Sequence, residues 1–314
     1  MSHSRRMNAV YSALAMRRRY EVWFLRCGLA DGSGAWWFRY LLMNPGRAPL
    51  DETSACATAQ VWATWFPRGG EPRSFIQGFR AGQLDLSPRR HIPFHCRIAE
   101  CGIEEGRCWG NLHVEGHDIS WRLELRSDFG VVLSDKGWIG FSRSPHSDAT
   151  FSGEIVLDGR AVRGEPLGFG VQGHNCGYRH RSYWRWMHAY FPQPGGKSST
   201  LEALVYDLPL GLTFRNAILW HDEKILRLHG ITEKPVVREP GRLEWQFTAT
   251  GPNGRRVAAS IEARAPEIHR LPYTKTDGSG TFPVANGSLA AARVTLGNEI
   301  LETSHGAVLE FGGV

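Results

Sequence analysis

The chain of 314 residues carries a formal net charge of +6, with 42% hydrophobic and 22% charged residues. These values are ordinary for a soluble globular protein of one large or two medium domains. No apolar run approaches the length of about 18 residues that spans a bilayer. The N-terminus also lacks the apolar core and cleavage site of a secretory signal. We therefore expect a cytoplasmic protein.

The positive charge comes almost entirely from arginine, in short clusters at residues 5–6, 17–19 and 89–90. These clusters are too short and scattered for a nucleic-acid footprint, and no recognition motif accompanies them, so we expect no nucleic-acid partner. Residues 1–20 contain no acid. They predict a short basic helix over residues 8–19, which would lie on the protein or make peripheral contact with an anionic membrane; a transit peptide has a similar composition.

The six cysteines have irregular spacing and form no Cys-x-x-Cys pair, which predicts free, buried thiols in a reducing compartment. Two histidine pairs, His91 with His95 and His113 with His117, are four residues apart. That spacing suits a metal only on a helix, and both pairs lie in segments that we expect to be extended. We therefore predict no metal site.

From Tyr20 onward, short strand-like runs alternate with turn signals about every 8–12 residues, a pattern typical of sandwiches and barrels. No phosphate-binding glycine motif, serine elbow or zinc motif interrupts them. In chain order, the expected strands are residues 20–28, 35–43, 60–66, 74–80, 95–101, 107–114, 119–125, 150–157, 160–165, 183–190, 200–207, 212–220, 225–233, 242–250, 257–265, 290–296 and 307–311.

Residues 141–150 are polar, contain a proline and show no periodicity, so we place a domain boundary there. The predicted domains are residues 1–145 and 146–314. Each has roughly the length at which an antiparallel sheet closes into a barrel around one ligand. The expected fold is therefore all-β, with two tandem antiparallel barrels and a short N-terminal helical segment.

The most informative stretch is residues 170–190. It begins with a glycine-punctuated segment, predicted to be a loop, and continues as a strand. Because side chains alternate along a strand, one face would carry two indoles, an imidazole and a phenol. This face is either an ordinary aromatic core or the wall of a ligand pocket with one group that titrates near neutral pH. Its four members are Trp184, Trp186, His188 and Tyr190.

Two motifs resemble those of a known superfamily. The first is Tyr-Glu-Val-Trp-Phe at residues 20–24, followed by an aromatic hairpin strand at residues 35–40. The second is His-Asn-Cys-Gly at residues 174–177, followed by Trp-Arg-Trp at residues 184–186. Together they resemble the two-domain lipocalin-like superfamily of carotenoid 1,2-hydratases (hydroxyneurosporene synthases), tocopherol cyclases, AttH-type proteins and lipocalin-like Diels–Alderases.

This resemblance implies lipocalin-like barrels that hold a hydrophobic isoprenoid or polyketide-like molecule. It also implies cofactor-free lyase or isomerase chemistry: hydration, cyclisation or pericyclic ring formation. Protonation of an alkene creates a carbocation that aromatic faces stabilise, and a buried acid can supply the proton. The alternative is a non-catalytic carrier for such a molecule. Neither interpretation requires a metal or a cofactor.

The chain departs from the superfamily pattern at two points. Cys176 stands where the motif usually has an aromatic residue. Asp207 directly follows Tyr206, whereas the hydratase pattern places the acid two residues after a tyrosine, so Glu202 is the acid that shares the face of Tyr206. The catalytic candidates are His188, Glu202, Tyr206 and Asp207, and the ligand-binding candidates are His174, Asn175, Cys176, Trp184, Trp186 and Tyr190. We expect Glu21 to be a structural acid satisfied by an arginine such as Arg39.

Overall fold

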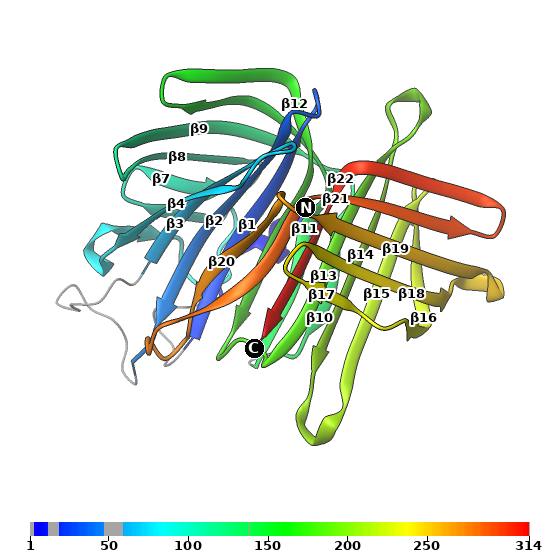
Figure 1. Ribbon diagram of the computed structural model, residues 1–314. Helices are drawn as coiled ribbons and strands as arrows, with labels where there is room; N and C mark the ends of the chain where they lie inside the picture. The colour runs from blue at the N-terminus through cyan, green and yellow to red at the C-terminus, as the bar shows by residue number, and fades with distance from the viewer. Residues whose placement is uncertain (1–2, 12–18, 47–58, 138, 314) are drawn as a thin grey trace.

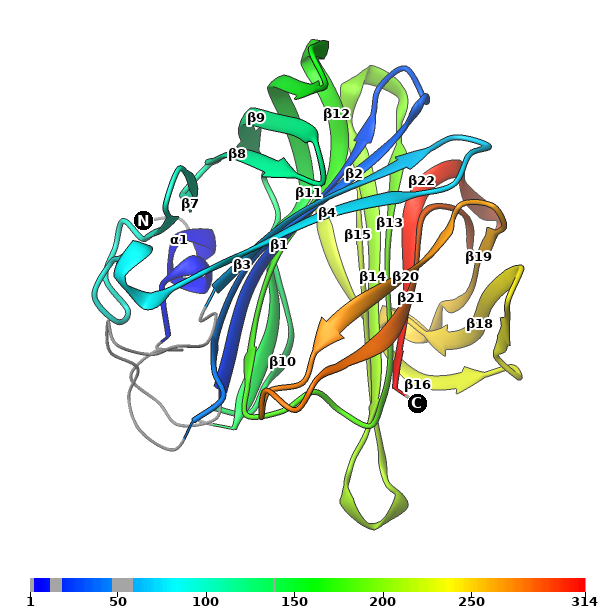
Figure 2. The same cartoon turned by 60° about the vertical axis from the view of Figure 1, so that its left-hand side comes forward.

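The computed structural model describes residues 3–11, 19–46, 59–137 and 139–313. Strands β1 to β12 form one antiparallel sheet and β13 to β22 form another. Both views of the molecule show the sheets side by side, the first in blue to green and the second in green to red (Figures 1 and 2). The expected all-β fold with two barrel-like domains is confirmed.

The first sheet is a curled, open half-barrel with the strand order β4-β3-β2-β1-β12-β11-β9-β8-β7-β6-β5, and β10 pairs with β11. Its strands are β1 (Arg19–Leu29), β2 (Gly34–Asn44), β3 (Ala59–Pro67), β4 (Arg73–Phe79), β5 (Leu84–Leu86), β6 (His95–Ile98), β7 (Cys101–Glu104), β8 (Arg107–Val114), β9 (His117–Arg126), β10 (Val131–Asp135), β11 (Gly140–Leu157) and β12 (Arg160–Gly177).

The second sheet closes into an eight-stranded barrel because β16 pairs with both β15 and β18. Its strands are β13 (Tyr183–Pro192), β14 (Ser198–Asp207), β15 (Thr213–His221), β16 (Lys224–Glu233), β17 (Val237–Glu239), β18 (Arg242–Thr250), β19 (Arg256–Arg264), β20 (Ile268–Thr274), β21 (Thr281–Leu296) and β22 (Glu299–Gly313). The helical elements are α1 (His3–Asn8), η1 (Ala81–Gln83), η2 (Pro194–Gly196), η3 (Pro209–Gly211) and η4 (Pro252–Gly254).

Side-chain alternation gives each sheet an inner core and an outer face. In β13, Met187, Ala189 and Phe191 point into the closed barrel, where they pack with many small side chains of the other strands. The barrel interior is thus filled by the protein itself. The opposite face of β13, with Trp186, packs against the first sheet.

The change from one sheet to the other comes after Gly177, later than the expected boundary between residues 145 and 146. That boundary falls inside β11, a continuous strand that pairs with β9, β10 and β12. The segment lacks hydrophobic periodicity because it carries buried polar groups: Ser144, Ser147 and Asp148 are at most 9% exposed. These groups make hydrogen bonds at the contact between the sheets and beside it.

The N-terminal segment differs from the predicted helix over residues 8–19. The helix α1 ends at Asn8, Val10 and Tyr11 are buried, and Arg19 already belongs to β1. Residues 12–18 lie outside the described ranges. After the helix, Tyr11 N donates to Glu21 Oε1 at 2.7 Å, which ties the segment to the side chain of a β1 residue.

The glycine-rich stretch before the Trp-Arg-Trp motif is part of β12 and not a loop. A Cβ atom at Gly170 would lie 1.9 Å from the carbonyl oxygen of Arg26, and one at Gly173 would lie 2.1 Å from the ring of Phe24. These glycines therefore let β12 and β1 approach closely where side chains from the first sheet cross over them.

Candidate functional site

A cavity of about 140 Å³ lies between the two sheets and opens to the surface. The strands β1, β2, β10, β11 and β12 of the first sheet form one side, and β13, β14, β20 and β22 of the second form the other. Aromatic side chains dominate its walls. They are Tyr20, Phe24, Trp37, Phe141, Trp184, Trp186, Tyr206 and Tyr273.

The Trp-Arg-Trp strand supplies the central wall of this cavity. Trp184 and Trp186 lie on the face of β13 that looks toward the first sheet, and Tyr206 lies opposite Trp184 on β14. Trp186 packs edge-on against Phe24, with ring centroids 5.4 Å apart. The predicted aromatic face therefore lines a space outside the barrel and not its interior.

Glu202 is fully buried directly behind this wall. Its Oε1 accepts hydrogen bonds from Trp186 Nε1 at 2.9 Å and Ser144 Oγ at 2.5 Å, and its Oε2 accepts one from Ser147 Oγ at 3.0 Å. Burial raises the pKa of Glu202 to about 7, although these hydrogen bonds oppose the rise. Glu202 does not line the cavity itself; the indole of Trp186 lies between its carboxyl group and the cavity.

His188 lies opposite Glu202 on the neighbouring strand and is also fully buried. Its Nε2 donates to the carbonyl oxygen of Ser147 at 2.6 Å. Burial lowers the pKa of His188 to about 3, although the bond to Ser147 opposes the fall, so the imidazole is neutral at pH 7. Like Glu202, it stands behind the cavity wall.

Tyr206 and Asp207 point to opposite faces of β14, as strand alternation requires. The hydroxyl of Tyr206 lines the cavity and shares a hydrogen bond with Ser134 Oγ at 2.9 Å. Asp207 accepts hydrogen bonds from Tyr183 N at 3.0 Å and from Ser182 Oγ. Asp207 thus fixes the start of β13, away from the cavity.

The three candidates of the His-Asn-Cys stretch separate by alternation. His174 points into the first sheet, where Nδ1 donates to the carbonyl oxygen of Met7 at 2.6 Å and Nε2 lies 2.9 Å from Glu21 Oε1. The expected pairing of Glu21 with Arg39 is wrong, because the two side chains lie on opposite faces of the sheet. Asn175 faces the cavity. Cys176 lies at its edge and packs with Tyr11 and Phe141.

Tyr190 is remote from the other members of its face. It stacks on Phe169 with ring centroids 5.1 Å apart, and it lines a second, more polar depression together with Asp148 and His221. The aromatic face of β13 is therefore divided between two surroundings, and its first half alone belongs to the cavity.

Sequence reasoning missed the carboxyl group that does line the cavity, Glu310 of β22. Its Oε1 accepts from Trp184 Nε1 at 3.1 Å, and its Oε2 accepts from the hydroxyl of Tyr273 at 2.7 Å. Glu310 pairs across strands with Trp186. Only this pairing could have pointed to Glu310 as a cavity residue, and the sequence does not reveal that the last strand of the chain lies beside β13.

His180, in the segment that joins the two sheets, occupies an aromatic box at the same cavity. Its ring stacks on Tyr20 at 4.3 Å and on Trp184 at 5.8 Å, and it is tilted against Tyr273 and Phe282. Burial, reinforced by the positive charge of Arg39, lowers the pKa of His180 to about 3. The side chain is neutral and fills space that a ligand could take.

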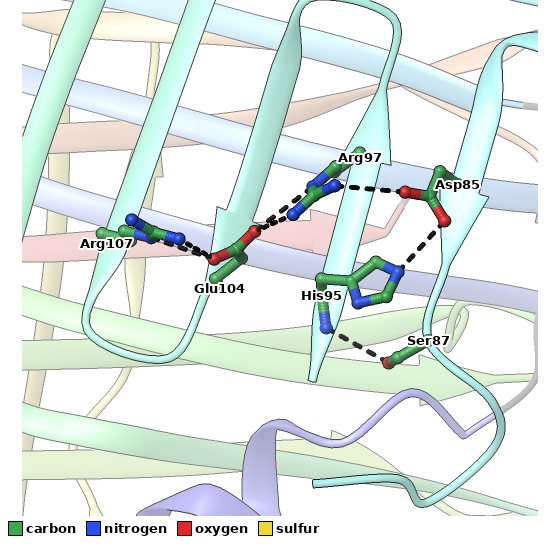
Figure 3. Close-up of polar contacts among 6 residues, drawn as sticks. All are labelled: Asp85, Ser87, His95, Arg97, Glu104 and Arg107. Carbon is green, nitrogen blue, oxygen red and sulfur yellow. Dashed lines mark hydrogen bonds and ion pairs between the residues drawn. The ribbon is translucent and has the colours of Figure 1, made fainter. Parts of the chain in front are cut away.

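The histidine pairs lie in extended or turning segments. His95 Nε2 is 3.1 Å from Asp85 Oδ1, in a surface chain of alternating charges that continues through Arg97, Glu104 and Arg107 (Figure 3). His113 and His117 contact Asp118 and Asp158 separately. Within the described ranges, no three His, Cys, Asp or Glu side chains cluster as metal ligands, and no helix has the length and apolar character for crossing a membrane.

No family model matches the chain, and no curated protein matches its sequence. Solved structures do match its fold. CghA with Sch210972 has a TM-score of 0.62 at 12% identity, over 95% of this chain and 89% of that one. Kievitone hydratase from Nectria haematococca has a TM-score of 0.55 at 10% identity, over 97% and 93%. An AttH-type protein from Nitrosomonas europaea has a TM-score of 0.57 at 12% identity, over 95% and 93%. The chain thus has the fold of the two-domain lipocalin-like proteins.

Proposed function

We propose that this protein binds a hydrophobic small molecule in the cavity between its sheets and catalyses a cofactor-free reaction on it. The reaction class is hydration of a double bond, cyclisation or pericyclic ring formation on an isoprenoid or polyketide-like skeleton. The observation that carries the proposal is the combination of aromatic walls with one carboxyl group among the described lining residues, Glu310, held by Trp184 and Tyr273.

The chemistry follows from these groups. Glu310 is 7% exposed and lies at the cavity surface, so its carboxyl can exchange a proton with a bound molecule. The faces of Trp184, Trp186 and Tyr273 can stabilise positive charge that develops on that molecule, by about 2 kcal/mol each when water is excluded.

In this proposal, the predicted proton donors Glu202 and His188 act as positioning residues. Neither reaches the cavity, but Glu202 holds the indole of Trp186 by a hydrogen bond. The role of proton donor is therefore assigned to Glu310 and not to Glu202 or His188. Two proteins of matching fold support the proposed class of function: CghA was solved with the small molecule Sch210972, and kievitone hydratase is named as a hydratase.

The first test is binding of an uncharged polyene, the methyl ester of cis-parinaric acid. We expect it to quench tryptophan fluorescence in the wild-type protein and to bind at least tenfold more weakly to Trp186→Ala. Equal binding by both proteins would remove the cavity as the ligand site, as would failure of the wild-type protein to bind either the ester or the corresponding acid.

The second test concerns catalysis on a substrate found by screening polyenes and polyketides for product formation. Glu310→Gln should lower turnover by about 10²–10⁴-fold, the usual contribution of a positioned acid, with the binding of the ester retained. The control is Glu302→Gln, an exposed residue of the same strand. Tight binding without turnover of any compound would favour the alternative function, a carrier.

A further inference from the structure

Arg39 of β2 is a buried cation that lines the cavity. Its side chain is 3% exposed. Among the described residues, no carboxylate forms an ion pair with it, and its Nη1 atom has no hydrogen-bond partner. The guanidinium lies over two aromatic faces, with its central carbon 3.8 Å from the ring centroid of Tyr273 and 4.5 Å from that of Trp62.

Such an arrangement leaves the guanidinium under-satisfied. Aromatic faces offset part of the cost of removing a cation from water, but they accept none of its directional N–H groups. A planar guanidinium is best satisfied by a carboxylate or another planar anion that accepts two hydrogen bonds at once. The empty positions of Arg39 therefore suit an anionic group brought in by a ligand.

Two further buried polar atoms at the same cavity have no partner. They are Nε1 of Trp37, two residues along β2 on the same face, and Oδ1 of Asn175 on β12. Buried polar groups in native proteins are almost always hydrogen-bonded, so three such atoms around one cavity mark a place where a ligand supplies the missing partners. Two of the three are donors.

The charges around the cavity favour an anion as well. Among the lining residues that the structure describes, four are cationic, Arg39, Lys136, Arg179 and Arg181, and one, Glu310, is acidic. Glu310 is already engaged by Trp184 and Tyr273 and forms no ion pair with Arg39 within the described part of the chain. A cavity lined mainly by one sign of charge attracts ligands of the opposite sign.

We propose that the ligand of this cavity is a hydrophobic molecule with an acidic group, a carboxylate or an ionised enol or phenol, and that Arg39 binds this group. The proposal rests on the proposed function and narrows its substrate class. In this arrangement, Arg39 and Trp37 hold the acidic end while the aromatic walls hold the apolar skeleton against Glu310.

The test compares cis-parinaric acid with its methyl ester, two polyenes that differ in the charge of one end. At pH 8.5 and low salt, the wild-type protein should bind the acid at least tenfold more tightly than the ester. Arg39→Met should abolish this preference by weakening the acid alone. Arg39→Lys, which keeps the charge but not the bidentate geometry, should retain part of it.

The matched control is Arg227→Met, an exposed arginine of β16 that does not line the cavity and whose loss changes the net charge equally. It should leave the preference intact. If Arg39→Met does not fold, Arg39→Lys provides the same comparison. Its preference for the acid over the ester should be smaller than that of the wild-type protein and should fall as the salt concentration rises.

The outcomes separate the two proposals. If the ester binds but the acid is not preferred, or if the preference persists in Arg39→Met, the acidic-ligand proposal is overturned and the cavity remains a binding site. If the wild-type protein binds neither compound, the proposed function itself is overturned.

Discussion

The indole N–H of Trp186 donates to a carboxylate oxygen of Glu202 at 2.9 Å. A wall of the cavity is thereby joined to a buried carboxyl whose pKa is raised to about 7. Around neutral pH, the acceptor of this bond changes between a carboxylate and a neutral acid. The position of Trp186 and the stability of the protein are therefore linked to pH through one residue.

Glu202→Gln should change how stability depends on pH. The folded protein keeps the proton of Glu202 up to about pH 7, whereas the unfolded chain loses it near pH 4.5. Glu202 therefore contributes most stability at low pH, and its contribution falls as pH rises between these values. Relative to wild type, the variant should gain on the order of 2 kcal/mol of unfolding free energy from pH 5 to pH 8.

Urea unfolding of both proteins at several pH values measures this difference, and taking the difference cancels the titration of buried histidines such as His188. The exposed Glu302→Gln should show no such trend. A difference between Glu202→Gln and wild type that stays constant with pH would contradict the raised pKa.

Arg26→Met should weaken the docking of the two sheets. The guanidinium of Arg26 is 1% exposed and donates to carbonyl oxygens of the second sheet, including Ser288 at 2.8 Å and His305 at 2.7 Å. Methionine would leave these acceptors buried and unpaired, at a cost of about 3 kcal/mol or more in unfolding free energy. Urea unfolding measures this loss. Arg227→Met is the control, and a loss below about 1 kcal/mol would show that the docking does not depend on Arg26.

The described thiols should be unreactive in the folded protein. Burial raises the pKa of Cys27 and Cys108 to about 12 and that of Cys101 to about 11, so almost no thiolate exists at pH 8. Ellman titration of the denatured protein should find six thiols. In the native Cys56→Ser variant, whose five remaining thiols are all buried, no fast reaction should occur. A fast thiol in that variant would contradict the burial.

His180→Ala should enlarge the cavity. Removing the imidazole vacates the box between Tyr20 and Trp184. If two more methylene groups of the parinaric methyl ester enter it, affinity should rise about tenfold. Fluorescence titration measures this change, with the exposed His229→Ala as control. Unchanged or weaker binding would show that His180 does not compete with the ligand.

Much of the fold could be predicted from the sequence because hydrophobic alternation is a local signal. Most expected strands are present with small differences at their ends. Four strands were not predicted: β5, β10 and β17 are short, and β20 contains Pro272, which signals against a strand although it is tolerated at a sheet edge. The single strand expected over residues 95–101 is β6 with the first residue of β7. The boundary was misplaced because buried serines in β11 have the composition of a loop.

The site was predictable only where its residues share one strand or one hairpin. Trp184, Trp186 and Tyr206 fall on the cavity by alternation and hairpin pairing alone. Arg39 and Glu310 come from opposite ends of the chain and meet at the cavity because the two sheets dock face to face. No local sequence pattern predicts that these two residues line the same cavity, because their proximity depends on which outer face each sheet buries.

The closed barrel is filled by its own side chains, so residues along β13 and β14 alternate between two roles, lining the cavity and forming the barrel core. Even-numbered positions such as 184, 186, 204 and 206 face the cavity, whereas odd-numbered positions such as 187, 203 and 205 form the barrel core. A combinatorial library confined to the even positions would therefore vary the ligand-facing surface while leaving the barrel core untouched. During divergence, selection for a new ligand could likewise proceed on every second residue, with the barrel core inherited unchanged.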